Sequence, residues 1–325
     1  MEAQLDMKRF SIRFSLKIFF LAFLCFLLTS SSWANQDGPS QSEKEELPAW
    51  EQKIPSEKKE FLTRGQKTLL LNAGSIVVIS IYGLTKWEYG ESSFHFKNEG
   101  WFGRGTKYGG ADKFGHFWSS YALSHLYSYT YRKWGYTDKE ANLYGALSSI
   151  GANLFMEVAD GFSPSQGFSY EDMIMNIGGC GVGYIWGRYP SLASKIDFRI
   201  EYTPQFTSHD FGFSTDYERQ KFLIALKADG FDFISNPYLQ YLEFHVGYYA
   251  RGYRGYEQGG PDDRRRHIYV GFGLNVSKLA QKFVNTRVLD YIQIPYTSVN
   301  KGFTSPFSAC MSAMSESFRW RKRPW

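Results

Sequence analysis

The first long apolar stretch of the chain after the N-terminal region runs from residue 67 to residue 86. Its central sequence, TLLLNAGSIVVISIYGLT, carries no charged residue over eighteen positions. At about this length a membrane-spanning helix and a buried helix of a soluble protein have the same pattern. Of the two, we expect a helix buried at the centre of the helical region.

Three further stretches have helical patterns, at about 112–134, 138–160 and 170–188. Ser169 precedes the last of them and Asp172 follows three residues later, which resembles a capping box with Asp in the place of Glu. Residues recurring every four positions on the later two stretches are small, so the helix backbones can approach closely. These small residues are Ala141, Gly145 and Ser149, and Gly179, Gly183 and Gly187.

Beyond Pro190 the period of the apolar positions changes to two. Apolar side chains alternate with charged ones in KIDFRIEYT, and they occupy every second position in HIYVGFGLNV. This alternation is typical of strands. KFLIALKADGF, YLQYLEFHVGYYARGY and LDYIQIPY are further candidates. The predicted fold class is therefore α+β, with an N-terminal bundle of about four apolar helices followed by a C-terminal antiparallel β-sheet packed on it.

The first 34 residues have the features of a secretory signal peptide. A basic region precedes the apolar run IFFLAFLCFLL, and SSSWA supplies the small residues that fit cleavage before Asn35. An uncleaved anchor is the alternative. Cys25 follows Leu24 rather than the small residue that a lipid-attachment site requires, so no lipoprotein is predicted.

These patterns divide the chain into five segments. They are a signal peptide at 1–34, a polar, Pro-interrupted linker at 35–60, a helical domain at 61–190, an antiparallel β-rich domain at 191–300 and a basic, aromatic tail at 301–325. The tail ends in FRWRKRPW, which suits an anionic lipid surface, with a solvated, frayed end as the alternative.

Composition narrows the choice of partners. Removal of the signal peptide takes away four basic and two acidic residues, so the net charge falls from +5 to +3. This balance does not indicate a nucleic-acid partner. The aromatic share of 18% suits a membrane interface or a sugar.

Only Cys180 and Cys310 remain after export, so at most one disulfide forms and stability must come from packing.

Each of the last three helices carries one polar stripe on an otherwise apolar sequence. Asp112 and His116 stand four residues apart and so share a helix face. Because a buried charge without a partner is costly, we expect the stripes to converge on one cluster, in which Lys113 and His116 compensate the carboxylates. The other stripes consist of Asn153, Glu157 and Asp160, and of Asp172 and Asn176.

The sequence leaves three interpretations of such a cluster open. His116 with Glu157, Asp160 or Asp172 has the donors of a divalent metal site or of a general acid–base pair. The second interpretation is a hydrogen-bonded network in which the acids at helix starts have capping roles. The third is docking of a lipid headgroup or a partner. No nucleophile elbow, P-loop, dinucleotide fingerprint or Cys-His zinc pattern occurs in the sequence.

Three motifs carry a resemblance to a known family. DKFGHF at 112–117, GANLFMEVADG at 151–161 and GFSYEDMIMNIGGCGVGY at 167–184 resemble the pattern of the YfiM-like predicted periplasmic lipoproteins, a family of unknown function. The Asp-Lys-x-x-His and Asp-x-x-x-Asn elements are more loosely similar to VanZ-like membrane proteins. The resemblance covers about residues 65–190 and implies an envelope location and a compact helical domain. The matching positions are Asp112, Lys113, His116, Glu157, Asp160, Gly167, Asp172 and Asn176.

The sequence thus predicts an exported protein of the periplasm, located against the outer membrane. The leading hypothesis is a membrane-associated binding or structural component that engages lipid or envelope glycan. The alternative is a hydrolase-like enzyme on a lipid or cell-wall substrate, with His116 as acid–base group or metal ligand and Glu157 or Asp160 as its partner. No cofactor is predicted, although a divalent metal is left open. The candidate binding residues are Asp112, Lys113, His116, Glu157, Asp160, Asp172 and Asn176.

Overall fold

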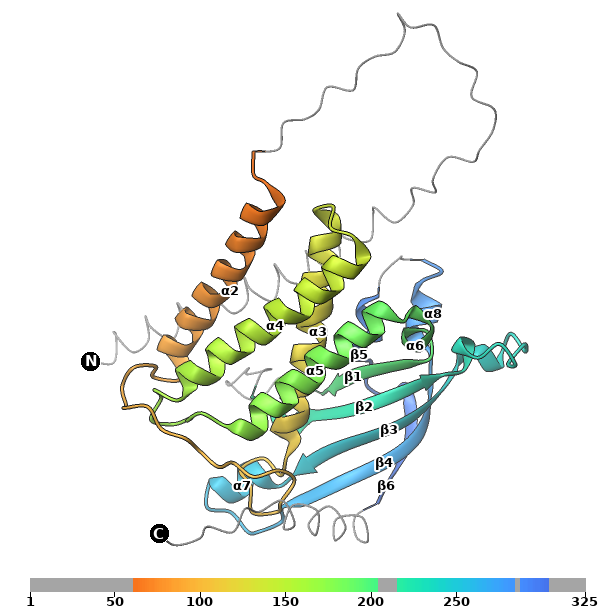
Figure 1. The fold of residues 1–325 in the computed structure, drawn as a ribbon. Coiled ribbons are helices and arrows are strands. Elements are labelled where there is room, and N and C mark those ends of the chain that lie inside the picture. Colours follow the sequence, from red (N-terminus) through yellow and green to blue (C-terminus); the bar gives the residue numbers. More distant parts are fainter. Residues whose placement is uncertain (1–60, 204–214, 284–286, 304–325) are drawn as a thin grey trace, which may run out of the picture.

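The computed structural model describes residues 61–203, 215–283 and 287–303 (Figure 1). The predicted signal peptide, the linker and all but the first residues of the predicted tail lie outside the described residues, as does Cys310. Cys180 is a free, buried cysteine.

Four long helices form the first half of the described chain: α2 (Arg64–Lys86), α3 (Ala111–Lys133), α4 (Asp138–Asp160) and α5 (Tyr170–Arg188). Two of them begin with a capping box, in which a threonine side chain and a glutamine or glutamate three residues later bond each other's backbone; these are Thr63 with Gln66 and Thr137 with Glu140. The helices predicted from apolar period are therefore confirmed, with boundaries shifted by at most a few residues.

The predicted position of the first helix is wrong. The centre of the helical region is occupied by α3, which packs against both α4 and α5. In α2 the only buried residue is Gly83. Within the described part of the chain, α2 is also the one helix long and apolar enough to cross a membrane, with a mean hydropathy of 1.7, and 6% of that apolar window is buried. The apolar sequence of α2, from which we expected a buried helix, therefore lies on an outer helix whose apolar side chains are exposed.

Small residues let the helices approach closely, as their spacing predicts. A Cβ atom at Gly179 would collide with the backbone carbonyl oxygen of Phe117, and one at Gly145 would collide with the Ser128 hydroxyl. The glycines of α4 and α5 therefore face mainly the central helix α3. Gly187 instead lies against the Asn142 side chain of α4.

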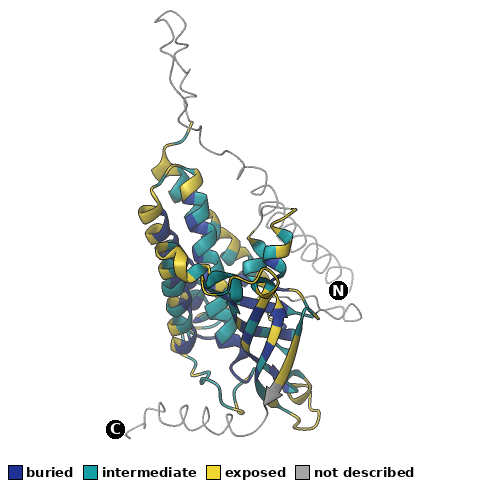
Figure 2. Ribbon diagram, turned by 90° about the vertical axis from the view of Figure 1, so that its right-hand side faces the viewer, coloured by how far each residue is buried: buried dark blue, intermediate teal, exposed yellow. Residues whose placement is uncertain are grey.

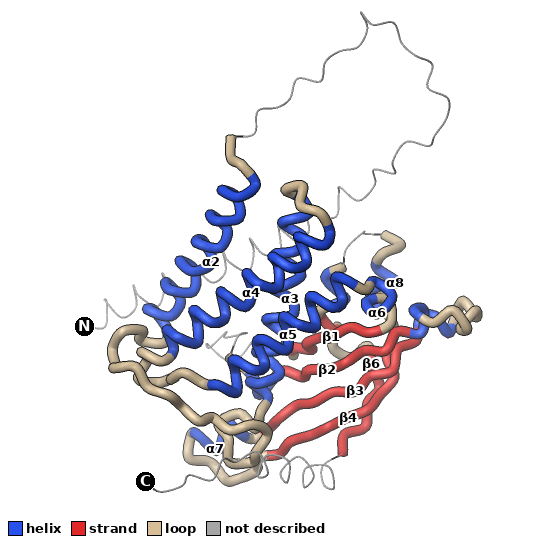
Figure 3. The backbone as a smooth tube through the Cα atoms, in the orientation of Figure 1, coloured by secondary structure: helices blue, strands red, loops and turns tan. Residues whose placement is uncertain are grey.

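The second half of the chain is a six-stranded sheet, drawn in red in Figure 3. The strand order is β5-β1-β2-β3-β4-β6, and every neighbouring pair is antiparallel except β1 with β5, so the sheet is mixed. The predicted α+β class is confirmed, while β6 was not predicted. The strands are β1 (Ile196–Tyr202), β2 (Gln220–Lys227), β3 (Leu242–Arg251), β4 (Arg265–Leu274), β5 (Ile292–Gln293) and β6 (Ser298–Phe303), and the short helices are α6 (Pro190–Ala193), α7 (Tyr253–Glu257) and α8 (Val276–Ala280).

Aromatic side chains join α3 to the sheet. The ring of Phe114 packs on Phe222 and Tyr248, with centroids 6.2 and 5.2 Å away. One helical turn further on, Phe117 packs on Phe198. The helix therefore has the sheet on one side and α4 and α5 on the other.

The sheet must curl, because its two edge strands are close in sequence. Five interstrand spacings of about 4.8 Å would separate the edges of a flat sheet by about 24 Å. Only residues 294–297 connect β5 to β6, and such a connection reaches at most about 18 Å. The curved strands are visible in Figure 1.

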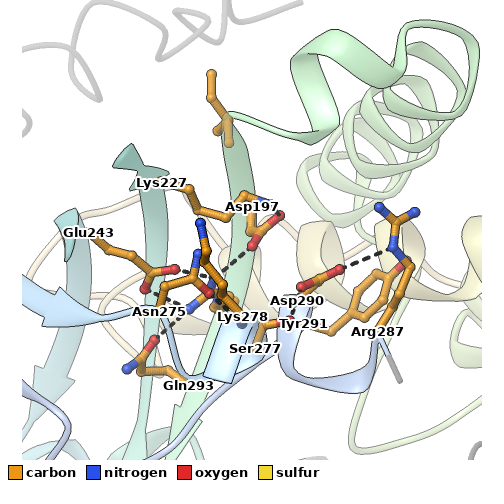
Figure 4. A network of polar contacts seen from close by, with 12 residues as sticks. Asp197, Lys227, Glu243, Asn275, Ser277, Lys278, Arg287, Asp290, Tyr291 and Gln293 are labelled. Carbon is orange, nitrogen blue, oxygen red and sulfur yellow. Dashed lines mark hydrogen bonds and ion pairs between the residues drawn. The ribbon is translucent and has the colours of Figure 1, made fainter. Parts of the chain in front are cut away.

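The concave face of this curled sheet is polar and buried, although strands that alternate apolar and charged residues commonly expose the charged face. Arg199 donates to both carboxylate oxygens of Glu243 at 2.7 and 2.8 Å and to Asp197 at 2.7 Å. Lys227 also donates to Asp197, at 2.8 Å. Several of these residues lie close together in Figure 4, where Gln293 belongs to the same network.

The opposite face of the sheet carries large apolar side chains, and several remain exposed where the helices do not cover them. Phe272 and Val299 are 65% and 83% exposed. Partly exposed neighbours on the same face are Ile224, Leu242, Val246 and Leu274. The apolar face is thus covered by α3 at Phe198, Phe222 and Tyr248 and exposed elsewhere.

Candidate functional site

The polar residues predicted to converge do meet at one end of the helical region. The start of α3 brings Asp112, Lys113 and His116, the end of α4 brings Glu157 and Asp160, and the start of α5 brings Asp172 and Asn176. The loop after α2 adds Glu99. We call these eight residues the polar cluster: Glu99, Asp112, Lys113, His116, Glu157, Asp160, Asp172 and Asn176.

Lys113 lies at the centre of three carboxylates. Its Nζ is 2.7 Å from Asp172, 2.8 Å from Glu99 and 2.8 Å from Asp112. Its side chain is 1% exposed. Burial alone would lower the pKa of Lys113, but the charges of Asp112, Asp172 and Glu99 raise it above its ordinary value. Burial likewise opposes ionisation of Glu99, yet the ammonium of Lys113 lowers the pKa of Glu99 to about 2. Lys113 is therefore a fixed positive charge.

His116 lies between two further carboxylates. Its Nδ1 is 3.6 Å from Glu157 Oε1, and its Nε2 is 3.7 Å from Asp172 Oδ1. Burial lowers the pKa of His116, but the charges of Asp172 and Glu157 outweigh it and raise the pKa. The side chain is 18% exposed, which leaves an edge of the ring in contact with the exterior.

Glu157 is oriented by a chain of hydrogen bonds that crosses all three helices. Asn176 donates to Glu157 Oε1 at 3.3 Å and accepts a 2.8 Å bond from the Ser120 hydroxyl. Burial raises the pKa of Glu157 to about 8, despite the opposing charge of His116. Burial also raises the pKa of Asp160 to about 6, against a hydrogen bond from Tyr89.

Negative charge is in excess within the polar cluster. Its five carboxylates face one lysine and one histidine, and Lys97 adds a pair with Glu99 at 3.2 Å. Two buried oxygens, Asp112 Oδ1 and Asp160 Oδ1, have no hydrogen-bond partner among the described residues. The cluster must therefore hold protons or a cation to balance its charge, because uncompensated buried carboxylates are costly.

The structure brings together all seven candidate residues predicted from the sequence, but not every member of their stripes. Asn153 bonds Ser149 of its own helix instead of the cluster. Ser169 caps α5 as predicted, while the Asp172 side chain pairs with Lys113. Glu99 and Tyr89 were missed, because the loop at 87–110 has no periodic pattern that could place its side chains.

A second polar site lies in the curled sheet. A cavity of about 640 Å³ opens on the concave face. No pattern in the sequence predicts it, because its lining comes from four strands and the loops between them. On its wall, Lys221 of β2 pairs with its cross-strand neighbour Glu201 of β1 at 2.6 Å. The lining residues are Glu201, Thr203, Glu218, Arg219, Lys221, Arg251, Tyr296, Ser298 and Asn300.

Residues 98–188 match the model of a protein family described as predicted periplasmic lipoprotein (DUF2279). Every residue of the polar cluster lies within this match. Searches of curated proteins and of solved structures found no match to the chain. No finding supports the looser similarity to VanZ-like proteins. The segment that builds the polar cluster is thus similar to a periplasmic lipoprotein family whose function is unknown.

Proposed function

We propose that this protein is a membrane-embedded component of the cell envelope, whose helical region engages lipid acyl chains directly. The observation that carries the proposal is the inverted distribution of side chains in the helices. Within the four long helices, which the structure describes completely, the buried residues include no Leu, Ile, Val, Met or Phe. Soluble proteins bury these residue types first.

Small and polar residues fill the places where the helices meet. Ser120, Ser124 and Ser149 are completely buried, as is Asn176. Helices in a bilayer pack through small residues and interhelical hydrogen bonds, because lipid removes the advantage of burying large apolar side chains. The Ser149 hydroxyl bonds the Ser120 carbonyl at 3.0 Å and is an example of such a contact.

The large apolar side chains point outward instead. Figure 2 shows exposed and intermediate residues along the outer surfaces of the helices. In water this surface would be a large apolar patch of the kind that marks a membrane or protein contact. Its most exposed members are Leu69, Leu70, Val77, Val78, Ile81 and Leu84 on α2, Leu143, Leu147, Leu154 and Val158 on α4, and Ile174, Ile177 and Ile185 on α5.

Charged residues are confined to the two ends of the bundle. The stretches 68–85, 117–131, 141–156 and 173–187 contain no Asp, Glu, Lys or Arg. At 1.5 Å per residue the first is about 27 Å long, close to the thickness of a bilayer's hydrocarbon core. The other three are shorter and carry polar residues between the helices. The polar cluster begins where these stretches end, so it would lie at the level of the lipid headgroups.

Membrane extraction of the full-length chain tests this proposal. An embedded helical region should keep the protein in the membrane pellet at alkaline pH in carbonate, and should make the purified protein float with liposomes. Release into the soluble fraction together with failure to float would contradict the proposal. A location at the outer membrane is part of the proposal and is tested by separating the two membranes on a density gradient.

An acid–base enzyme is the second candidate function. It is favoured by the position of His116 between two carboxylates, one of which, Glu157, has a pKa of about 8. Replacing His116 by Gln keeps a hydrogen-bonding side chain but removes proton transfer. The variant would be tested for whether it replaces the wild-type protein in cells that lack it. A folded His116→Gln protein that fails to do so would support this candidate, whereas one that works as well as the wild type would exclude it.

A further inference from the structure

We propose that His116, Glu157 and Asp172 bind one divalent transition-metal cation of the zinc class. The three residues come from α3, α4 and α5, and each can supply one ligand atom, with all three atoms within 4.8 Å of one another. His116 is the most exposed of the three, at 18%, whereas the side chains of Glu157 and Asp172 are 2% and 6% exposed. This inference does not depend on membrane embedding.

The distances around His116 suit ligands of one metal better than hydrogen-bonded partners. Its nitrogens lie 3.6 and 3.7 Å from the oxygens of Glu157 and Asp172, beyond the range of about 2.7–3.2 Å for such hydrogen bonds. Two ligands at about 2.0–2.2 Å from a tetrahedral zinc ion are about 3.4 Å apart. Because these two distances are to different nitrogens of the ring, only one nitrogen can ligate the ion. One ring nitrogen and one oxygen of each carboxylate lie within 4.8 Å of one another, so the three ligands would have to draw together around the ion.

A second group of carboxylates, formed by Glu99, Asp112 and Asp172, has comparable spacing but is already occupied. Lys113 Nζ lies within 2.8 Å of all three, so an ammonium ion holds the place that a metal would take. Among the described residues, Glu157 forms no ion pair with a lysine; its ion pair is with His116. Asp172 belongs to both groups, and its Oδ1 lies 2.7 Å from Lys113 Nζ. His116 and Glu157 are therefore the two residues that distinguish the proposed metal site from the site held by Lys113.

The surroundings of the three ligands are built to orient them. Asn176 donates to Glu157 Oε1 and is itself held by Ser120, as is typical of outer-shell residues in metal sites. Asp112 is 94% buried, and while its Oδ2 pairs with Lys113, its Oδ1 lacks a hydrogen-bond partner among the described residues. One imidazole nitrogen with two carboxylates favours Zn²⁺ or Mn²⁺ over Ca²⁺ and Mg²⁺, which prefer oxygen ligands alone.

Metal analysis of the full-length protein in detergent micelles tests the proposal. Protein stripped with chelator, reloaded with ZnCl₂ and desalted should retain about one zinc per chain. His116→Gln and Glu157→Gln should each weaken zinc affinity by at least about 100-fold. Substitution of a residue that only orients a metal ligand weakens affinity by about 10- to 100-fold. His267→Gln, the same substitution at a histidine of β4, should bind zinc like the wild type. Absence of stoichiometric zinc from the wild type, or unchanged binding by His116→Gln, would overturn the proposal.

Cobalt substitution provides a readout that needs no variant. Co²⁺ bound by His116 and two carboxylates should give visible absorption bands stronger than those of the aqueous ion, and these bands should vanish when zinc is added. A spectrum identical to that of aqueous Co²⁺ would overturn the proposal even if the variants fail to fold. Because both measurements are made in micelles, their failure would leave the membrane proposal standing.

Discussion

The ammonium nitrogen of Lys113 on α3 lies 2.7 Å from Oδ1 of Asp172 on α5, 59 residues further along the chain. Both side chains are almost completely buried. The pair fixes the start of α5 beside the start of α3 and thereby sets the position of His116, one turn further along α3. This ion pair is therefore the structural basis of the polar cluster.

Replacing Lys113 by Met should destabilise the protein by about 3–5 kcal/mol, because three buried carboxylates lose their shared cation. Denaturant titration in micelles would measure the change. Arg104→Gln is the matched control, since Arg104 pairs with Asp262 at 3.2 Å on the surface, and such pairs contribute at most about 1 kcal/mol. Equal effects of the two substitutions would contradict the role given to Lys113.

Two glycines of α5 should respond in opposite directions to substitution by alanine. At Gly179 the added Cβ would strike the Phe117 carbonyl and push α5 away from α3, so a loss of about 1–3 kcal/mol is expected. At Gly181 a Cβ meets no atom within 4 Å, and the better helix propensity of alanine should add about 0.5–1 kcal/mol. Thermal unfolding of both variants side by side checks the difference, and a neutral Gly179→Ala would show that the helices pack less closely than described.

A lysine in the middle of α2 distinguishes lipid from water as the surroundings of that helix. Val77 is 55% exposed. If water surrounds α2, Val77→Lys should change the free energy of unfolding by at most about 0.5 kcal/mol. If this position lies at the centre of a bilayer, the substitution should cost about 2.5–3.5 kcal/mol of insertion free energy. We expect the second result, seen as a reduced membrane-inserted fraction in a flotation assay. The control is Phe233→Lys, at an 82% exposed position in the β half, which should leave the membrane-inserted fraction unchanged. A Val77→Lys variant that inserts like the wild type would argue against lipid contact by α2.

Acid should weaken the sheet through Glu243. Burial favours the protonated form of Glu243, but bonds from His245 and the charge of Arg199 lower its pKa below the ordinary value. A carboxylate with a lowered folded-state pKa stabilises fully above its unfolded pKa and loses that contribution as the pH falls. The stability difference between wild type and Glu243→Gln should therefore shrink as the pH falls below about 4.5.

Urea titrations at a series of pH values would follow this difference. Glu91→Gln, at an exposed loop position, serves as the control and should track the wild type at every pH. A constant difference between wild type and Glu243→Gln from pH 6 to pH 3 would contradict the assigned role of Glu243.

Periodic signals in the sequence predict the helices and the convergence of their polar stripes. Asp112 with His116, and Glu157 with Asp160, lie on single helix faces, so their convergence follows from helix geometry and the cost of unpaired burial. The contribution of Glu99 could not be predicted in this way, because a loop side chain is placed by tertiary contacts. Strand β6 could not be predicted either, because apolar and polar residues alternate too weakly in its sequence to indicate a strand.

The position of α2 could not be predicted, because hydrophobicity alone does not say which solvent surrounds a helix. The charge-free sequence 68–85 fits a soluble core and a bilayer equally. What separates them is the identity of the residues on the buried side, and this requires the packing. Ser120 and Ser124 facing the interior of the bundle, with Leu147 outside, are visible only once the helices are assembled.

Spin-label accessibility in liposomes tests the central claim, that lipid covers the outer helix faces, most directly. Single cysteines at Val77, Leu147 and Ile177, in a chain whose three native cysteines are replaced by alanine, would carry nitroxides on α2, α4 and α5. We predict that molecular oxygen dissolved in the bilayer relaxes all three labels while a water-soluble nickel complex does not. A label at Phe233 should show the reverse preference. The claim would be contradicted if the nickel complex relaxed the three helix labels as strongly as it relaxes the label at Phe233.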